Sequence, residues 1–170
     1  MTDFIKAMNP TANLTTESAA LDAARISAVG LVLGAINQAV AGWYTTTEAG
    51  IEASRNVVEQ MLGQAPTPEQ MAQQAQSGLI MTGVFVLLQL GLAVLQWSKP
   101  NRVIPIIFLV FVLLGLGATS LAFFIPAMAA AQPMWITLMT IVLMAVAATT
   151  HIAAIRGVGA LNRIQMAAAQ

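Results

Sequence analysis

The chain has 170 residues, of which 58% are hydrophobic and only 8% are charged, whereas about 25% of the residues in an ordinary soluble domain are charged. Its formal net charge is zero, so bulk electrostatics gives no reason to expect nucleic acid as a partner. It has no cysteine, which excludes disulfides, thiolate metal ligands and thiol catalysis. The sequence therefore predicts an all-α integral membrane protein, a four-transmembrane-helix bundle in a lipid bilayer, with residues 1–170 as one domain.

The first residues, Met1–Asn9, can form a short helix with one apolar face. Phe4, Ile5 and Met8 share that face, and Asn9-Pro10 would end the helix because the residue before a proline disfavours the α conformation. We expect such a helix to lie on the membrane surface. A frayed terminus is the alternative, since two helical turns are not stable in water without tertiary contacts.

A polar segment, Thr11–Ser18, leads into the first long helix. Thr15 or Thr16 is suited to cap that helix, because a threonine hydroxyl accepts a hydrogen bond from a free N–H of the first turn. Acidic residues near the start also argue against a cleavable signal peptide, which begins with basic residues followed directly by an apolar core. We therefore expect the first span to remain as an anchor.

The first span is predicted over residues 26–44, between Arg25 and the Trp43-Tyr44 pair, which is typical of a membrane–water boundary. Three glycines at spacings of four and eight residues give this helix a face without side chains: Gly30, Gly34 and Gly42. Such spacing lets a second helix approach closely. The partner helix can belong to the same chain or to another one.

Residues 45–77 form the long polar segment of the chain and are predicted to fold as a helical extramembrane hairpin between the first and second spans. Thr45-x-x-Glu48 fits a capping box, and Gly63–Pro66 ends the helix that follows it. Thr67-Pro68-Glu69-Gln70 is a stronger start signal, with threonine at the cap and proline at the first helical position. The apolar stripe of the first of these helices comprises Ile51, Val58, Met61 and Leu62.

The second span is predicted over residues 79–97, within a helix that begins at Pro68. From Pro68 to Trp97 this helix would be about 45 Å long, whereas the hydrocarbon core is about 30 Å thick. Its first turns should therefore project into water. A tight connection, Ser98–Arg102, leads to the third span.

From Val103 to Ile155 the chain has no Asp, Glu, Lys or Arg. About 20 apolar residues cross a bilayer as a helix, so this run suits two spans. Pro126 and Pro133 interrupt it, because each removes a backbone donor where a helix would continue. The third and fourth spans are therefore predicted over residues 103–125 and 134–155, and the fourth helix can continue past Arg156 toward Arg163.

The basic residues indicate the orientation of the chain. Six of the seven basic residues fall on the side that holds both termini and the connection between spans two and three: Lys6, Arg25, Lys99, Arg102, Arg156 and Arg163. Arg55 alone falls on the other side. By the positive-inside bias, the N- and C-termini are predicted to be cytoplasmic. The small size and alanine-rich composition suggest a bacterial inner membrane.

Three amide side chains lie well inside the predicted spans: Asn37, Gln38 and Gln89. No acid or base accompanies them, although coupled transporters place an ionisable group near the middle of the membrane. Hydrogen bonding between helices, worth about 0.6–2 kcal/mol for each contact, is the simpler explanation. The alternative is a neutral polar path through a homo-oligomeric channel or facilitator.

His151 is the only histidine, and it is a candidate cofactor-binding residue. Imidazole can bind a haem iron, contact a quinone or carry protons. A second haem ligand would have to be a methionine or come from a second chain. The simpler interpretation is an interfacial histidine that hydrogen-bonds to a backbone carbonyl or a neighbouring threonine.

Further small residues favour close helix packing in the last two spans: Gly115, Ala145 and Ala153. The spans lack catalytic triads, paired carboxylates, glycine-rich phosphate loops and metal-ligand patterns. We therefore expect neither an enzyme nor a metal site, and the leading hypothesis includes no cofactor. The leading hypothesis is a small structural or accessory subunit that packs against copies of itself or against other membrane-protein chains. The channel is the alternative, and a haem- or quinone-contacting accessory subunit using His151 is the third hypothesis.

Overall fold

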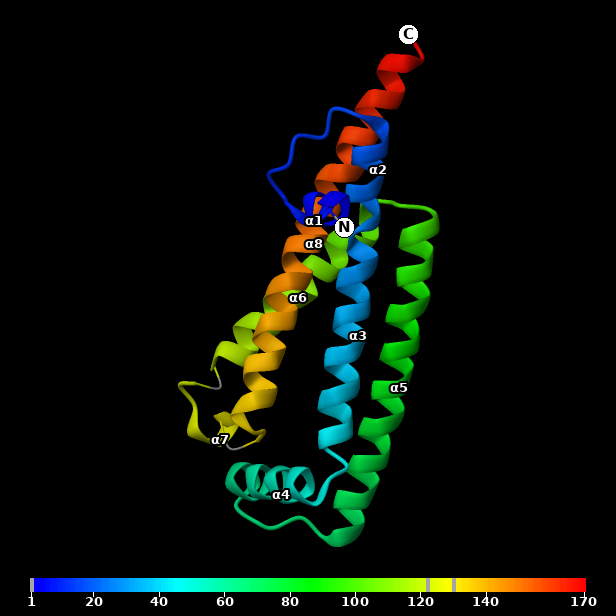
Figure 1. Cartoon of the computed structure of the whole chain (residues 1–170). Coiled ribbons are helices and arrows are strands. Elements are labelled where there is room, and N and C mark those ends of the chain that lie inside the picture. The colour runs from blue at the N-terminus through cyan, green and yellow to red at the C-terminus, as the bar shows by residue number, and fades with distance from the viewer. Residues whose placement is uncertain (1, 122, 130) are drawn as a thin grey trace.

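The computed structural model describes residues 2–121, 123–129 and 131–170, and over them it is helical without any strand (Figure 1). Four helical segments are long and apolar enough to cross a membrane, which agrees with the prediction of a multi-pass membrane protein. The helices are α1 (Thr2–Met8), α2 (Glu17–Arg25), α3 (Ser27–Tyr44), α4 (Glu48–Leu62), α5 (Pro68–Ser98), α6 (Val103–Leu121), α7 (Pro126–Ala129) and α8 (Met134–Ala168).

The first span is longer than predicted. Thr16 caps α2, since its hydroxyl accepts a hydrogen bond from the N–H of Ala19 at 3.3 Å, which confirms a helix start at Thr15 or Thr16. Ile26, which joins α2 to α3, keeps a right-handed helical conformation. The two helices therefore form one apolar segment of 28 residues, Glu17–Tyr44.

The start of α4 differs from the prediction. Thr47, not Thr45, is the cap, and its hydroxyl accepts from the N–H of Gly50 at 3.1 Å. The hydroxyl of Thr45 instead donates to the carbonyl of Gly42, three residues back in α3. The hydroxyls of all three consecutive threonines donate to carbonyls in the last turn of α3, and among them Thr47 is the one that also accepts from an N–H of α4.

Both ends of the following connection match the sequence signals. Gly63 ends α4 with φ 72°, the left-handed conformation that glycine adopts without steric cost. Thr67 and Gln70 form the predicted capping box at the start of α5, with hydrogen bonds of 3.3 and 2.9 Å. In Figure 1, helix α4 runs crosswise to α5 below the end of α3, and it does not run alongside α5.

The region near Pro126 also differs from the prediction. Helix α6 ends at Leu121, four residues before the predicted end, and the N–H of Phe124 bonds to the carbonyl of Leu121 in a turn. Pro126 begins the short helix α7, because the first helical position needs no N–H donor. Helix α8 then begins at Met134, as predicted, and continues beyond Arg163 to Ala168.

Helix α3 is the centre of the packing: it contacts α5 on one side and α8 on another, while α8 also packs against α2 and α6. Over the described residues α5 and α6 scarcely touch, although they are consecutive in the chain. The four long segments therefore pack in the order α5, α3, α8, α6. The side between α5 and α6 is left uncovered by other helices.

At the end of the helices where both termini lie, buried contacts join α2, α5 and α8. Gln96 is fully buried, and its amide donates to the carbonyls of Ala24 and Asn101. Ala7 of α1 packs in an apolar cluster with Ile26 and Ala153. Of the apolar face predicted on α1, Met8 packs against this cluster and Ile5 is exposed, whereas Phe4 is not among the described side chains.

Candidate ligand cavity between the four spans

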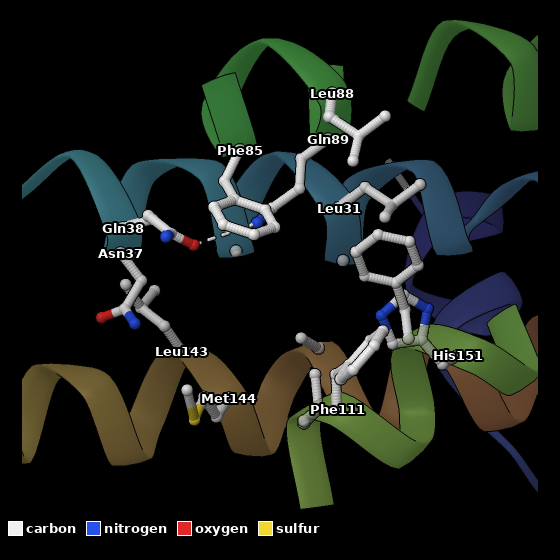
Figure 2. Close-up of a pocket in the computed structure, with 15 residues that line it drawn as sticks. Leu31, Asn37, Gln38, Phe85, Leu88, Gln89, Phe111, Leu143, Met144 and His151 are labelled. Atoms are coloured by element: carbon white, nitrogen blue, oxygen red, sulfur yellow. Dashed lines mark hydrogen bonds between the residues drawn. The ribbon is translucent and has the colours of Figure 1, made fainter. Parts of the chain in front are cut away.

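A cavity of about 390 Å³ lies between α3, α5, α6 and α8 (Figure 2). This size is within the range of about 300–1,000 Å³ that is typical of small-molecule sites. Its lining is mostly apolar, with polar side chains from three of the four helices. The polar lining residues are Asn37, Gln38, Gln89 and His151. Each was singled out from the sequence, and the structure brings all four together.

His151 lies at one end of the cavity. It is only 1% exposed, and its Nδ1 lies 2.7 Å from Oγ of Ser27 on α3. The simpler interpretation expected a backbone carbonyl or a neighbouring threonine as the partner, and Ser27 is neither. Nε2 of His151 has no hydrogen-bond partner among the described residues. Because no fully buried side-chain nitrogen or oxygen among them lacks a partner, Nε2 is not fully buried and is open to the cavity.

The Ser27 contact assigns the tautomer of His151. Oγ of Ser27 has no other hydrogen-bond partner in the described chain, so its proton is satisfied only if it donates to Nδ1. Nε2 then carries the imidazole proton. The reverse tautomer would leave the serine proton and the Nε2 lone pair without partners, and this is the costlier arrangement. His151 therefore presents an N–H donor to the cavity.

Gly30 makes room for the imidazole. A Cβ at Gly30 would lie 3.1 Å from Cε1 and 3.2 Å from Nε2 of His151, and it would overlap Oγ1 of Thr150. Any larger residue at this position would displace the ring. The sequence predicted close packing at Gly30, and the close neighbour is α8 of the same chain.

Amide groups form the opposite end of the cavity (Figure 2). Oγ1 of Thr140 donates to Oδ1 of Asn37 at 2.8 Å, so the NH₂ group of Asn37 is left without a partner in the described chain and open to the cavity. Nε2 of Gln89 donates to Oε1 of Gln38 at 3.2 Å. The orientation of each amide follows from these hydrogen bonds. This end therefore also offers N–H donors.

Gly34 gives Gln89 its place beside α3. A Cβ on Gly34 would lie 2.7 Å from Oε1 of Gln89. The glycine face predicted on this helix thus admits a polar side chain at Gly34, whereas at Gly42 it admits Thr82 of α5. Both neighbours belong to the same chain.

Aromatic rings line the part of the cavity between its polar ends. The ring centroid of Phe108 lies 6.2 Å from that of His151, and Phe111 packs edge to face on Phe108 at 6.1 Å. Phe85 approaches from α5 (Figure 2). Phe85 and Phe111 line the cavity and are nevertheless 43% and 60% exposed. They therefore mark an opening on the side between α5 and α6.

The two polar ends have a defined separation. His151 lies beside Gly30 and the amide end includes Asn37, seven residues further along α3. Seven residues of α-helix rise by about 10 Å. The two polar ends are therefore about two helical turns apart along α3.

Other predicted packing residues lie outside the cavity. Gly115 contacts the flexible end of Met144 on α8, Ala153 is buried beside Ile26, and Ala145 is exposed. Ser27, Thr140 and the phenylalanines were not predicted as site residues. Thr140, Ala147 and His151 do share one face of α8 by their spacing of seven and four residues. No sequence signal connects Ser27 with His151.

Met144 cannot supply the second ligand of a haem bound to His151. Met144 lines the same cavity, but it lies on the same helix as His151, two turns away, and cannot bind the opposite face of one iron. The described residues contain no group of three or more His, Cys, Asp or Glu that could hold a metal ion.

Comparisons with known proteins give no family for this chain. No family model, curated protein or solved structure matches it. What the cavity can do is hold a flat, apolar molecule that has a hydrogen-bond acceptor at each end.

Proposed function

We propose that the protein is a small accessory membrane subunit that binds a quinone-like ring in the cavity between its four spans. The observation that carries the proposal is the pair of N–H donor groups, His151 and Asn37, at opposite ends of an aromatic-lined cavity. A quinone has two carbonyl acceptors across a planar ring. A donor group at each end of the cavity can therefore bond to one of these carbonyls.

The opening between α5 and α6 suits the rest of such a ligand. Membrane quinones carry long apolar tails, and Phe85 and Phe111 at the opening are exposed to the surroundings of the spans. In a bilayer these surroundings are hydrocarbon. The ring can therefore enter sideways from the lipid, with its tail remaining among the acyl chains.

The proposal includes a membrane topology. The four long segments cross a bacterial inner membrane as a bundle, α4 and the first turns of α5 form an extramembrane hairpin, and both termini are cytoplasmic. Both termini lie at the end of the molecule opposite α4 (Figure 1). The distribution of the basic residues supports the cytoplasmic assignment of that end.

Binding of a short-chain ubiquinone with one isoprene unit to the purified protein tests the function. We expect saturable binding in mild detergent, with thermal stabilisation at saturating ligand. His151→Phe keeps a ring but removes the N–H donor, and should weaken binding about five- to tenfold, the equivalent of one net hydrogen bond. Thr149→Ala is the matched control, because Thr149 is exposed and bonds only within α8.

A competition experiment and a native extraction test whether binding depends on the quinone ring. Dodecanol is apolar but lacks the ring and the paired carbonyls, so it should not compete with the quinone. Quinone extracted with natively purified protein would give independent support. Equal binding of quinone by wild type and His151→Phe, or full competition by dodecanol, would contradict the proposal.

A structural subunit without a ligand is the second candidate. Its support is that no described atom lies within 4 Å of the Cβ position at Gly83 or Gly91 of α5 or at Gly117 of α6. These glycines could admit helices of other chains. Gly91→Leu would then abolish co-purification of a partner, and the wild type would not bind quinone. A homo-oligomeric channel is less well supported, because Asn37, Gln38 and Gln89 lie between the helices of one chain.

A further inference from the structure

A second concave site lies along the C-terminal part of α8. It has a volume of about 680 Å³ and is formed by α8, the start of α6 and the connection between α1 and α2. Three of its lining residues are basic: Arg102, Arg156 and Arg163. None of the described residues that line it is acidic.

The three arginines line the pocket along one face of α8. Arg156 and Arg163 are seven residues apart and therefore share a face, about 10 Å from each other along the helix. Gly159 lies between them and is buried. Nη2 of Arg102 rests against Gly159, and its Cζ lies 3.3 Å from the position that a Cβ would occupy there. Any side chain at position 159 would push Arg102 away from the other two arginines.

The charges in this pocket are not compensated within its lining. Nη2 of Arg156 donates to a neutral group, the carbonyl of Ala12, at 3.4 Å. A guanidinium has five N–H donors, so most of the donor capacity of the pocket is free. Like charges repel at such distances. A bound anion would remove this repulsion, and Asn162 and Thr11 add neutral polar groups to the same pocket.

The depth of the pocket points to the kind of anion. Arg102 immediately precedes the uncharged run Val103–Ile155, and Arg156 immediately follows it. Both therefore stand at one boundary of the apolar layer, where lipid phosphates lie. Arginine binds phosphate oxygens through two parallel hydrogen bonds, and basic pockets between spans bind anionic headgroups.

We propose that this pocket binds the phosphodiester headgroup of an anionic phospholipid. The spread of the arginines over about 10 Å provides for two phosphate groups. Diphosphatidylglycerol should therefore bind more tightly than phosphatidylglycerol, and both more tightly than zwitterionic phosphatidylcholine. The site is independent of the quinone cavity, which lies further along α8 and shares no lining residue with it.

Native mass spectrometry of the full chain with these three lipids tests the proposal. Arg163→Gln should weaken retention of diphosphatidylglycerol about fivefold, the effect expected for one arginine near a charged membrane surface. Arg156→Gln with Arg163→Gln should weaken it further. Lys99→Gln is the matched control, since it removes one positive charge from the same end of the molecule but does not line the pocket.

Equal retention of phosphatidylcholine and diphosphatidylglycerol would overturn the proposal, and so would the same loss of lipid in Lys99→Gln as in Arg163→Gln. Circular dichroism of each variant shows whether the helices are intact, and no hydrogen bond within the described chain depends on the Arg163 side chain. Inorganic pyrophosphate distinguishes the source of the phosphate. If pyrophosphate alone stabilises the wild type and Arg163→Gln abolishes this effect, the ligand is a soluble phosphate and the phospholipid assignment is wrong.

Discussion

Ser27 and His151 are 124 residues apart in the chain, and their side chains lie 2.7 Å apart between α3 and α8. Both side chains are almost fully buried. Because the serine hydroxyl has no other acceptor in the described chain, it donates to Nδ1 and leaves the proton of the ring on Nε2. The contact thus joins two spans and also sets the proton that faces the cavity.

Ser27→Ala should release this tautomer and destabilise the protein by about 1–3 kcal/mol, because a buried imidazole nitrogen loses its partner. Nitrogen-15 NMR of the imidazole should change from a single Nε2–H form to a mixture, and quinone binding should weaken. Thr149→Ala, which removes an exposed hydroxyl, should change stability by less than about 0.5 kcal/mol. An unchanged tautomer in Ser27→Ala would show that the serine does not determine which ring nitrogen carries the proton.

Much of the fold follows from local sequence signals. The capping box at Thr67 and the helix stop at Gly63–Pro66 each act through neighbouring residues, and each was predicted correctly. The start of α4 was misplaced because Thr45 and Thr47 have the same capping chemistry, and Thr45 belongs to the end of α3 while Thr47 begins α4. Local chemistry could not choose between them.

The candidate site was predictable only in part. Polar residues are conspicuous in apolar spans, so Asn37, Gln89 and His151 were identified from the sequence. Their partners Ser27 and Thr140 were not, because a hydroxyl in an apolar helix can bond to its own backbone and gives no signal of a distant contact. The opening between α5 and α6 arises from the packing order of whole helices, which periodicity does not determine.

Gly157→Ala should separate α2 from α8. A Cβ at Gly157 would meet the backbone nitrogen of Ala24 and lie 2.6 Å from the carbonyl carbon of Ala23, and these backbone atoms cannot rotate away. We expect a loss of about 1–3 kcal/mol or more, as for overpacked cores. Gly91→Ala is the control, since no described atom lies within 4 Å of its Cβ position; it should be neutral or stabilising by up to about 1 kcal/mol. Equal melting temperatures in detergent would contradict the packing of α2 on α8.

The Asn37–Thr140 hydrogen bond should contribute measurable coupling between α3 and α8. A double-mutant cycle with Asn37→Leu and Thr140→Val should give a coupling energy of about 0.6–1.7 kcal/mol, the range found for such bonds between membrane helices. Thermal unfolding of the four proteins in one detergent measures it. Additive effects of the two changes would mean that this bond, 2.8 Å long between buried atoms, adds nothing to stability.

Cysteine labelling tests the topology, and the absence of native cysteine makes each introduced thiol unique. Gln64, between α4 and α5, and Lys99, between α5 and α6, are both exposed and lie at opposite ends of α5. Because six of the seven basic residues lie at the end that includes Lys99, we expect a cysteine at position 64 to react with an impermeant maleimide in intact cells and one at position 99 to react only after lysis. The reverse pattern would place the termini outside and move the arginine pocket to the outer leaflet.

Labelling of both sites in intact cells would mean that α5 does not cross the membrane. In that case the cavity between α3, α5, α6 and α8 would open to water, and the apolar ring proposed as its ligand would have no path from the lipid.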